Sequence, residues 1–223
     1  MMTVTIREIF VAPGTGPAGL AWDGATLWHA DYRDGRLYAL DPATCTVRRS
    51  LRCSGTLGGL TWDGLALWVA IYDQEMLRRV NPLTNDFDET LLLTGRGWLS
   101  GAAWDGRNLW TVAQQRGELL AIDRTKNEVR PPLPAVVALG DIDWRNGFLW
   151  ASAAVPMRYD PTVGRFEWLA DKPAHAILQI DPADGREVAR YPVDHLYTGL
   201  CWKGDDLWLA HSPGNTLYRA RLE

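Results

Sequence analysis

The chain has 223 residues, 47% of them hydrophobic, and a formal net charge of −4 at neutral pH. This length and composition allow a substantial buried core. The negative charge and the lack of a basic run argue against nucleic acid and against an anionic membrane surface as partners. No apolar stretch in the sequence is long enough to span a membrane.

The N-terminal segment Thr3–Val11 alternates apolar and polar residues, as a strand does, and lacks the apolar core of a signal peptide. The three cysteines, Cys45, Cys53 and Cys201, form an odd set without CxxC spacing. Such a set is typical of free thiols in a reducing compartment. We therefore expect a cytoplasmic protein.

A repeat dominates the rest of the sequence. Ten of the 12 tryptophans form five pairs with the same spacing: Trp22/Trp28, Trp62/Trp68, Trp104/Trp110, Trp144/Trp150 and Trp202/Trp208. The surrounding segments are GLAWDGATLW, GLTWDGLALW, GAAWDGRNLW, DIDWRNGFLW and GLCWKGDDLW. A repeat of about 40 residues with four short strands is typical of a β-propeller blade. The sequence predicts an all-β protein, a single five-bladed propeller over residues 1–223.

The first blade shows the expected strands in chain order. They are predicted at Gly19–Trp22, Leu27–Asp31, Arg36–Leu40 and Val47–Leu51, with tight turns at Asp23-Gly24 and Asp41-Pro42. The five blades are expected at about residues 17–53, 57–94, 99–133, 139–193 and 197–223. The last repeat ends after its third strand, so the N-terminal strand, about residues 3–11, is expected to complete that blade and close the ring.

The paired tryptophans have two interpretations. Large flat side chains fill the space between packed sheets, and a buried tryptophan removes about 200 Å² from water. The alternative is a ring of exposed platforms on which sugars stack. We favour packing, because apolar residues such as Leu27 flank the tryptophans.

The loops at one end of the propeller are the expected ligand site. They differ between blades although the strands repeat, as in a site built on a regular scaffold. We expect a small polar molecule or peptide to bind at this mouth of the central channel. The candidate ligand-binding residues are Asp31, Tyr32, Tyr72, Trp98, Gln114, Arg158 and Trp168. Arg33, Arg96 and Arg116 lie in the same loops and are suited to a carboxylate.

Blade four carries an insertion at about residues 154–173. It resembles a copied hairpin with its turn at Asp160-Pro161, and it is predicted to rise over the mouth as a lid carrying Arg158 and Trp168. In the alternative interpretation, Trp168 anchors the hairpin to its own blade.

Five residues are candidate proton carriers: Asp141, Asp143, His195, His211 and Tyr197. The two aspartates occupy positions where the other repeats have glycine or a small residue, and a carboxylate among apolar walls has a raised pKa. An enzyme site requires the carboxylates and histidines to converge. The alternatives are solvated histidines and an Asp143 that binds backbone amides across the channel. No cofactor is predicted, although a divalent metal between His195 and His211 is left open.

The pattern G-L-x-W-D-G-x-x-L-W-x-A, followed by L-x-x-I/L-D-P-x-T, resembles bacterial propellers related to plant-type glutaminyl cyclases and streptogramin-type lyases. The resemblance to the cyclases implies five blades and a catalytic glutamate in a T-E-G-L-like stretch, whereas the resemblance to the lyases implies a longer chain with more blades. The nearest stretch here, Tyr197-Thr198-Gly199-Leu200, has no acidic residue. The His/Glu arrangement of the lyases has no counterpart identified in this sequence.

Two functions therefore stay open. One is an enzyme of lyase, cyclotransferase or hydrolase type that performs acid–base chemistry on a small polar substrate at the mouth. The other is a non-catalytic propeller that binds a carbohydrate, peptide or protein there. The irregular, polar mouth loops favour the enzyme by a small margin.

Overall fold

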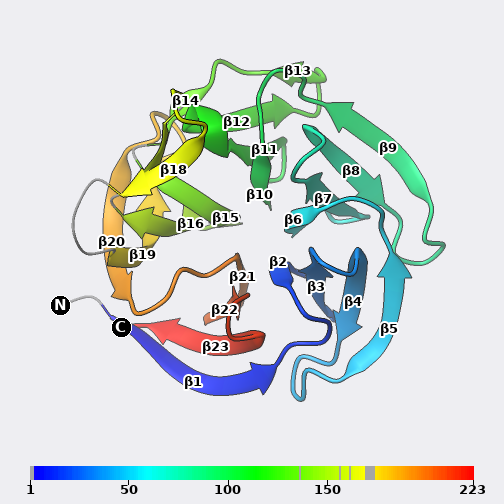
Figure 1. Cartoon of the computed structure of the whole chain (residues 1–223). Helices are drawn as coiled ribbons and strands as arrows, with labels where there is room; N and C mark the ends of the chain where they lie inside the picture. Colours follow the sequence, from blue (N-terminus) through cyan, green and yellow to red (C-terminus); the bar gives the residue numbers. More distant parts are fainter. Residues whose placement is uncertain (1–2, 136, 156, 161, 169–173) are drawn as a thin grey trace.

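The computed structural model describes residues 3–135, 137–155, 157–160, 162–168 and 174–223. Five antiparallel sheets surround a central axis (Figure 1). Blade one contains β2 (Pro17–Trp22), β3 (Leu27–Asp31), β4 (Arg36–Leu40) and β5 (Val47–Arg52). Blade two contains β6 (Leu57–Trp62), β7 (Leu67–Ile71), β8 (Met76–Val80) and β9 (Phe87–Leu92). The predicted all-β, five-bladed propeller is confirmed.

The other three blades follow the same order. Blade three contains β10 (Leu99–Trp104), β11 (Asn108–Ala113), the 3₁₀ helix η1 (Gln114–Arg116), β12 (Glu118–Asp123), β13 (Glu128–Val129) and β14 (Leu133–Pro134). Blade four contains β15 (Ala138–Arg145), β16 (Phe148–Val155), β19 (Ala174–Ile180) and β20 (Glu187–Val193). Blade five contains β21 (Gly199–Lys203), β22 (Asp206–His211), β23 (Thr216–Leu222) and β1 (Val4–Val11).

The N-terminal strand closes the ring as predicted. β1 pairs antiparallel with β23 from Val4 opposite Leu222 to Val11 opposite Thr216, with a bulge after Ile6. This pairing covers the outer edge of β23, which otherwise presents unpaired backbone groups.

The tryptophan in the second strand of each blade is buried between sheets, with exposures of 0–7%: Trp28, Trp68, Trp110, Trp150 and Trp208. In blades one to three, the aspartate of the W-D-G turn also accepts a hydrogen bond from the indole Nε1, at 2.7–2.9 Å. Arg145 and Lys203 replace that aspartate in blades four and five. The packing interpretation of these five tryptophans is confirmed.

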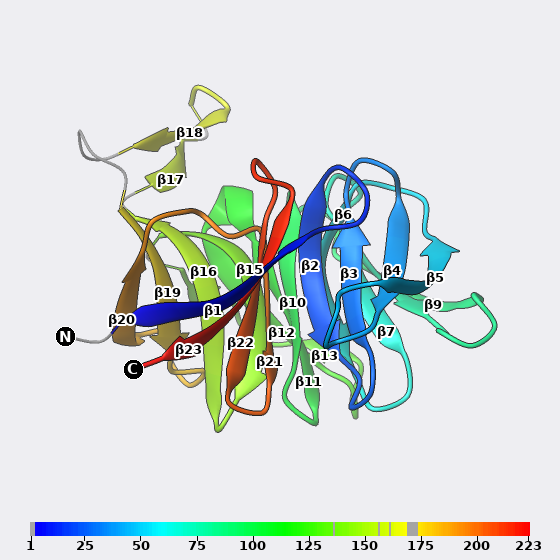
Figure 2. The ribbon, with the colours of Figure 1, turned by 90° about the horizontal axis from the view of Figure 1, so that it is seen from below.

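The predicted hairpin of blade four is a separate two-stranded sheet made of β17 (Met157–Asp160) and β18 (Arg165–Trp168). It projects from the face that carries the loops between second and third strands (Figure 2), and β17 lies beside η1. Asp160 Oδ1 accepts a hydrogen bond from the Thr162 amide at 2.8 Å, and Pro161 lies outside the described residues. The lid function stays a prediction.

Within the described parts of the chain, no helix is long and apolar enough to cross a membrane.

Candidate functional site at the channel mouth

A cavity of about 320 Å³ lies at the mouth of the central channel, and we call it the mouth pocket. All five blades contribute to its lining: Ala18, Tyr32, Thr56, Leu57, Gly58, Tyr72, Ser100, Gln114, Gly140, Leu196, Tyr197 and Thr198. Four of the predicted site residues, Tyr32, Tyr72, Gln114 and Tyr197, are therefore brought together here. The small lining residues, which stand at or before the first strand of each repeat, were not predicted from the sequence.

Tyr72 and Gln114 connect three blades across the mouth. The Tyr72 hydroxyl donates to Gln114 Oε1 at 2.9 Å, and Gln114 Nε2 donates to the Leu139 carbonyl at 2.7 Å. The Trp98 ring stacks on Tyr72 with a centroid distance of 5.3 Å. Burial raises the pKa of Tyr72 to about 12, so its hydroxyl is neutral at physiological pH.

Tyr197 brings the predicted histidines next to the mouth pocket. Its ring makes edge contacts with His195 and His211, and the two imidazoles stack with a centroid distance of 4.5 Å. Burial lowers the pKa of His211, and the nearby His195 and His175 lower it further. Burial raises the pKa of Tyr197 to about 12. The lowered pKa of His211 favours its neutral form, and the raised pKa of Tyr197 keeps its hydroxyl protonated. Among the described residues, no set of three His, Cys, Asp or Glu is arranged to hold a metal ion.

Asp141 directly follows the mouth-pocket residue Gly140 and is fully buried. Its carboxylate accepts hydrogen bonds from the backbone amides of Ala102, Ile142 and Leu200, which belong to three blades. The matching repeat position in the other blades is a glycine, and a Cβ on Gly59 would lie 2.3 Å from Asp141 Oδ1. The glycines therefore leave room for one carboxylate, whose pKa burial raises well above its usual value.

Asp143 binds backbone amides further along the channel. It accepts from Trp144 at 2.8 Å and from Trp202 at 2.7 Å. Trp202 follows the mouth residue Thr198 by four positions, which is about 13 Å along a strand. The structure therefore does not bring Asp143 together with His195, and its contacts match the alternative in which it ties strands together.

Asp31 is also separate from the mouth pocket lining. It is fully buried and accepts four amide hydrogen bonds, from Thr15, Gly16, Arg33 and Asp34, at 2.7–3.1 Å. Burial alone would raise the pKa of Asp31, but the four hydrogen bonds together lower it. These bonds attach the crossover before β2 to the loop after β3. The side chains of Arg158 and Trp168 lie outside the described residues.

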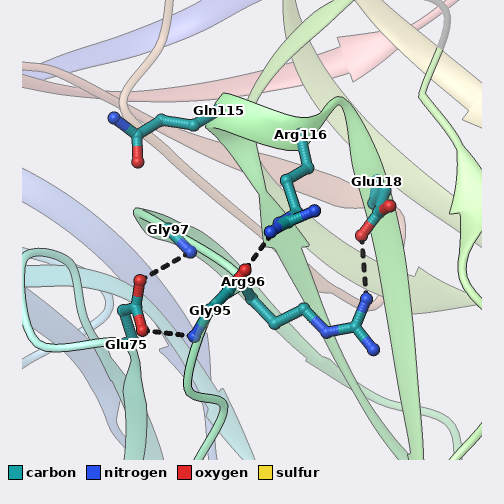
Figure 3. Close-up of a pocket in the computed structure, with 7 residues that line it drawn as sticks. All are labelled: Glu75, Gly95, Arg96, Gly97, Gln115, Arg116 and Glu118. Atoms are coloured by element: carbon teal, nitrogen blue, oxygen red, sulfur yellow. Dashed lines mark hydrogen bonds and ion pairs between the residues drawn. The ribbon is translucent and has the colours of Figure 1, made fainter. Parts of the chain in front are cut away.

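A second cavity, of about 570 Å³, lies on the same face between blades two and three, and we call it the rim pocket. Figure 3 shows its lining: Glu75, Gly95, Arg96, Gly97, Gln115, Arg116 and Glu118. Its two arginines were identified from the sequence. Glu75 and Glu118 were not, because no sequence pattern distinguishes a glutamate that lines a pocket from one that is solvated.

The chain shares its fold with a bacterial glutaminyl cyclase. The cyclase, from Myxococcus xanthus, superposes with a TM-score of 0.78 and 14% sequence identity, covering 100% of this chain and 97% of the cyclase. A streptogramin B lyase matches with a TM-score of 0.52 and 19% identity, covering 95% of this chain and 66% of the lyase. The virginiamycin B lyase of Staphylococcus aureus matches with a TM-score of 0.52 and 16% identity, covering 96% of this chain and 69% of that enzyme.

These similarities confirm the structural resemblance that the repeat pattern indicates. At identities of 14–19% they concern the fold alone. No protein-family model matches the sequence, and no curated protein sequence is significantly similar to it.

Proposed function

We propose that the protein binds a small organic molecule in the mouth pocket. The observation that carries this proposal is the lining, in which loops and strand ends of all five blades surround one cavity on the channel axis. Concave sites with an apolar lining and a few polar groups are where proteins bind small molecules. The mouth loops also differ between blades while the strands repeat, as expected of a functional site on a scaffold.

The lining chemistry indicates which part of a ligand enters the mouth pocket. None of the twelve lining side chains is charged, and the polar ones carry hydroxyl or amide groups. Tyr72 and Gln114 are already oriented by their hydrogen bonds, so little side-chain entropy is lost on binding. An uncharged, largely apolar group with one or two hydrogen-bonding atoms fits this environment.

A second candidate function is acid–base catalysis on the bound molecule. It is favoured by the contact of Tyr197 with the stacked His195 and His211, since imidazoles next to a pocket are suited to proton transfer. Asp141 and Asp143 contribute less to this candidate, because their oxygens accept backbone amides below the mouth pocket.

A pair of matched variants tests the proposal. Thr56→Trp places a large side chain in the mouth pocket, whereas Thr46→Trp makes the same change at an exposed turn on the opposite face. A library of uncharged aromatic fragments is screened by ligand-observed NMR against both variants and the parent protein. We expect fragments that bind the parent and Thr46→Trp but not Thr56→Trp. Fragments that bind all three proteins equally would refute the mouth pocket as the site.

The bound fragments then test catalysis. Each is incubated with the parent protein and with His211→Ala, and products are followed by mass spectrometry. Conversion by the parent that is lost in His211→Ala, with binding retained, supports the enzyme. Binding without conversion across the series favours the non-catalytic function.

A further inference from the structure

The rim pocket contains a cationic group that forms no ion pair with the part of the chain that the structure describes. Arg96 forms an ion pair with Glu118 at 3.2 Å. Both oxygens of Glu75 accept backbone amides, from Gly95 at 2.7 Å and from Gly97 at 2.8 Å. Arg116, by contrast, donates from Nε to the neutral Gly95 carbonyl at 2.6 Å and has no ion pair among the described residues. Its two Nη groups are therefore left to bind an anion.

The loops that carry these groups are fixed in place. Glu75 connects the loop after β7 to the crossover that contains Gly95 and Gly97, both of which have positive φ. The positive φ of Gly97 favours glycine, and a Cβ there would lie 2.4 Å from Gln115 Oε1 and push that side chain aside. Figure 3 shows Arg116 reaching from η1 to the same crossover. An arginine held in this way needs little reorganisation to bind an oxyanion.

The rim pocket and the mouth pocket are neighbours along three segments. Tyr72 of the mouth precedes Glu75 of the rim by three residues, Gly97 of the rim precedes Ser100 of the mouth by three, and Gln114 and Gln115 are consecutive. Three residues of extended chain span at most about 10 Å. The stacked rings of Tyr72 and Trp98 lie on these same segments. One elongated small molecule can therefore reach both pockets.

We infer that the natural ligand is a small organic acid, with an uncharged apolar group in the mouth pocket and a carboxylate bound by Arg116 in the rim pocket. This inference rests on the proposed function. A single negative charge suits the rim pocket better than a dianionic phosphate, because Glu75 and Glu118 line it too. The planar guanidinium of Arg116 also matches the geometry of a carboxylate.

Two probes of equal shape test the inference: 6-phenylhexanoate and its uncharged analogue 6-phenylhexanamide. We expect the parent protein to bind the acid about tenfold more tightly than the amide, as for one charge-assisted hydrogen bond. Arg116→Gln should weaken the acid about tenfold and leave the amide unchanged, and Arg116→Lys should retain part of the preference. Arg52→Gln, which removes the same charge at an exposed position on blade one, should change neither affinity. Raising the salt concentration should reduce the preference for the acid.

The outcomes separate the inference from the proposed function. Equal affinities of acid and amide for the parent protein, with both lost in Thr56→Trp, would refute the carboxylate site and support the mouth pocket. An acid preference that survives Arg116→Gln would also refute it. Failure of both probes to bind would refute the inference that one ligand occupies both pockets. The fragment screen separately decides whether the mouth pocket binds small molecules.

Discussion

Asp143 should make the protein less stable as the pH rises from about 4 to about 7. Burial raises the pKa of this carboxyl from 3.8 to about 7, and the hydrogen bonds from Trp202 and Trp144 offset only part of that effect. Because the folded state holds the proton more tightly than the unfolded state, the stabilisation is complete below pH 3.8 and is lost as the pH approaches 7. A change in pKa of this size corresponds to about 4 kcal/mol, which is a ceiling for a residue that is not fully buried.

The variant Asp143→Asn removes this titration and keeps a side-chain oxygen for one of the two amides. Free energies of unfolding are measured by guanidinium denaturation at pH values from 4 to 8, with the fluorescence of the 12 tryptophans as the signal. Relative to the parent, we expect the variant to gain stability steadily over this range, by up to about 4 kcal/mol. Parallel profiles for the two proteins would refute the assigned burial and pKa of Asp143.

Two further predictions concern other polar groups. Burial lowers the pKa of His29 from 6.5 to about 4, against the opposing effects of Asp31 and the Pro13 carbonyl, so its stabilisation is full above pH 6.5 and is lost as the pH falls to 4. His29→Phe should therefore remove up to about 3 kcal/mol of acid sensitivity in the same denaturation series. Asp23→Ala should cost about 2–4 kcal/mol, because it deletes hydrogen bonds to the Trp28 indole and to two turn amides. Lys203→Ala, at the matching position of blade five, should cost less than about 1 kcal/mol in the same assay, since Lys203 contributes a cation–π contact with Trp22.

The architecture was predictable because the repeat encodes it locally. Each Trp pair marks the first two strands of a blade, and the missing strand after Leu222 indicated that Val4–Val11 closes the ring. These features depend on strand periodicity and turn residues, which neighbouring positions in the sequence determine. The same holds for the hairpin of β17 and β18.

The site was less predictable, because its groups meet through the ring rather than along the chain. Asp141 illustrates this: the sequence showed a carboxylate in place of glycine but not that amides of three blades surround it. Tyr72 and Gln114 were identified from their loops, whereas their mutual hydrogen bond requires blades two and three to be adjacent. Burial and partner geometry decide whether a polar residue binds a ligand or supports the fold, and the sequence specifies neither directly.

The opposite pKa changes of Asp143 and His29 predict that replacing them has opposite effects on the pH dependence of stability. Between pH 7 and pH 4, Asp143 contributes up to about 4 kcal/mol of added stability and His29 removes up to about 3 kcal/mol. The carboxyls with lowered pKa, such as Asp31 and Asp123, act below this range. Relative to the parent, acidification should therefore destabilise Asp143→Asn and stabilise His29→Phe. Asp141, whose pKa burial also raises, is present in all three proteins and does not enter these differences. Differences of the same sign in the two variants would contradict the opposing roles of the two groups.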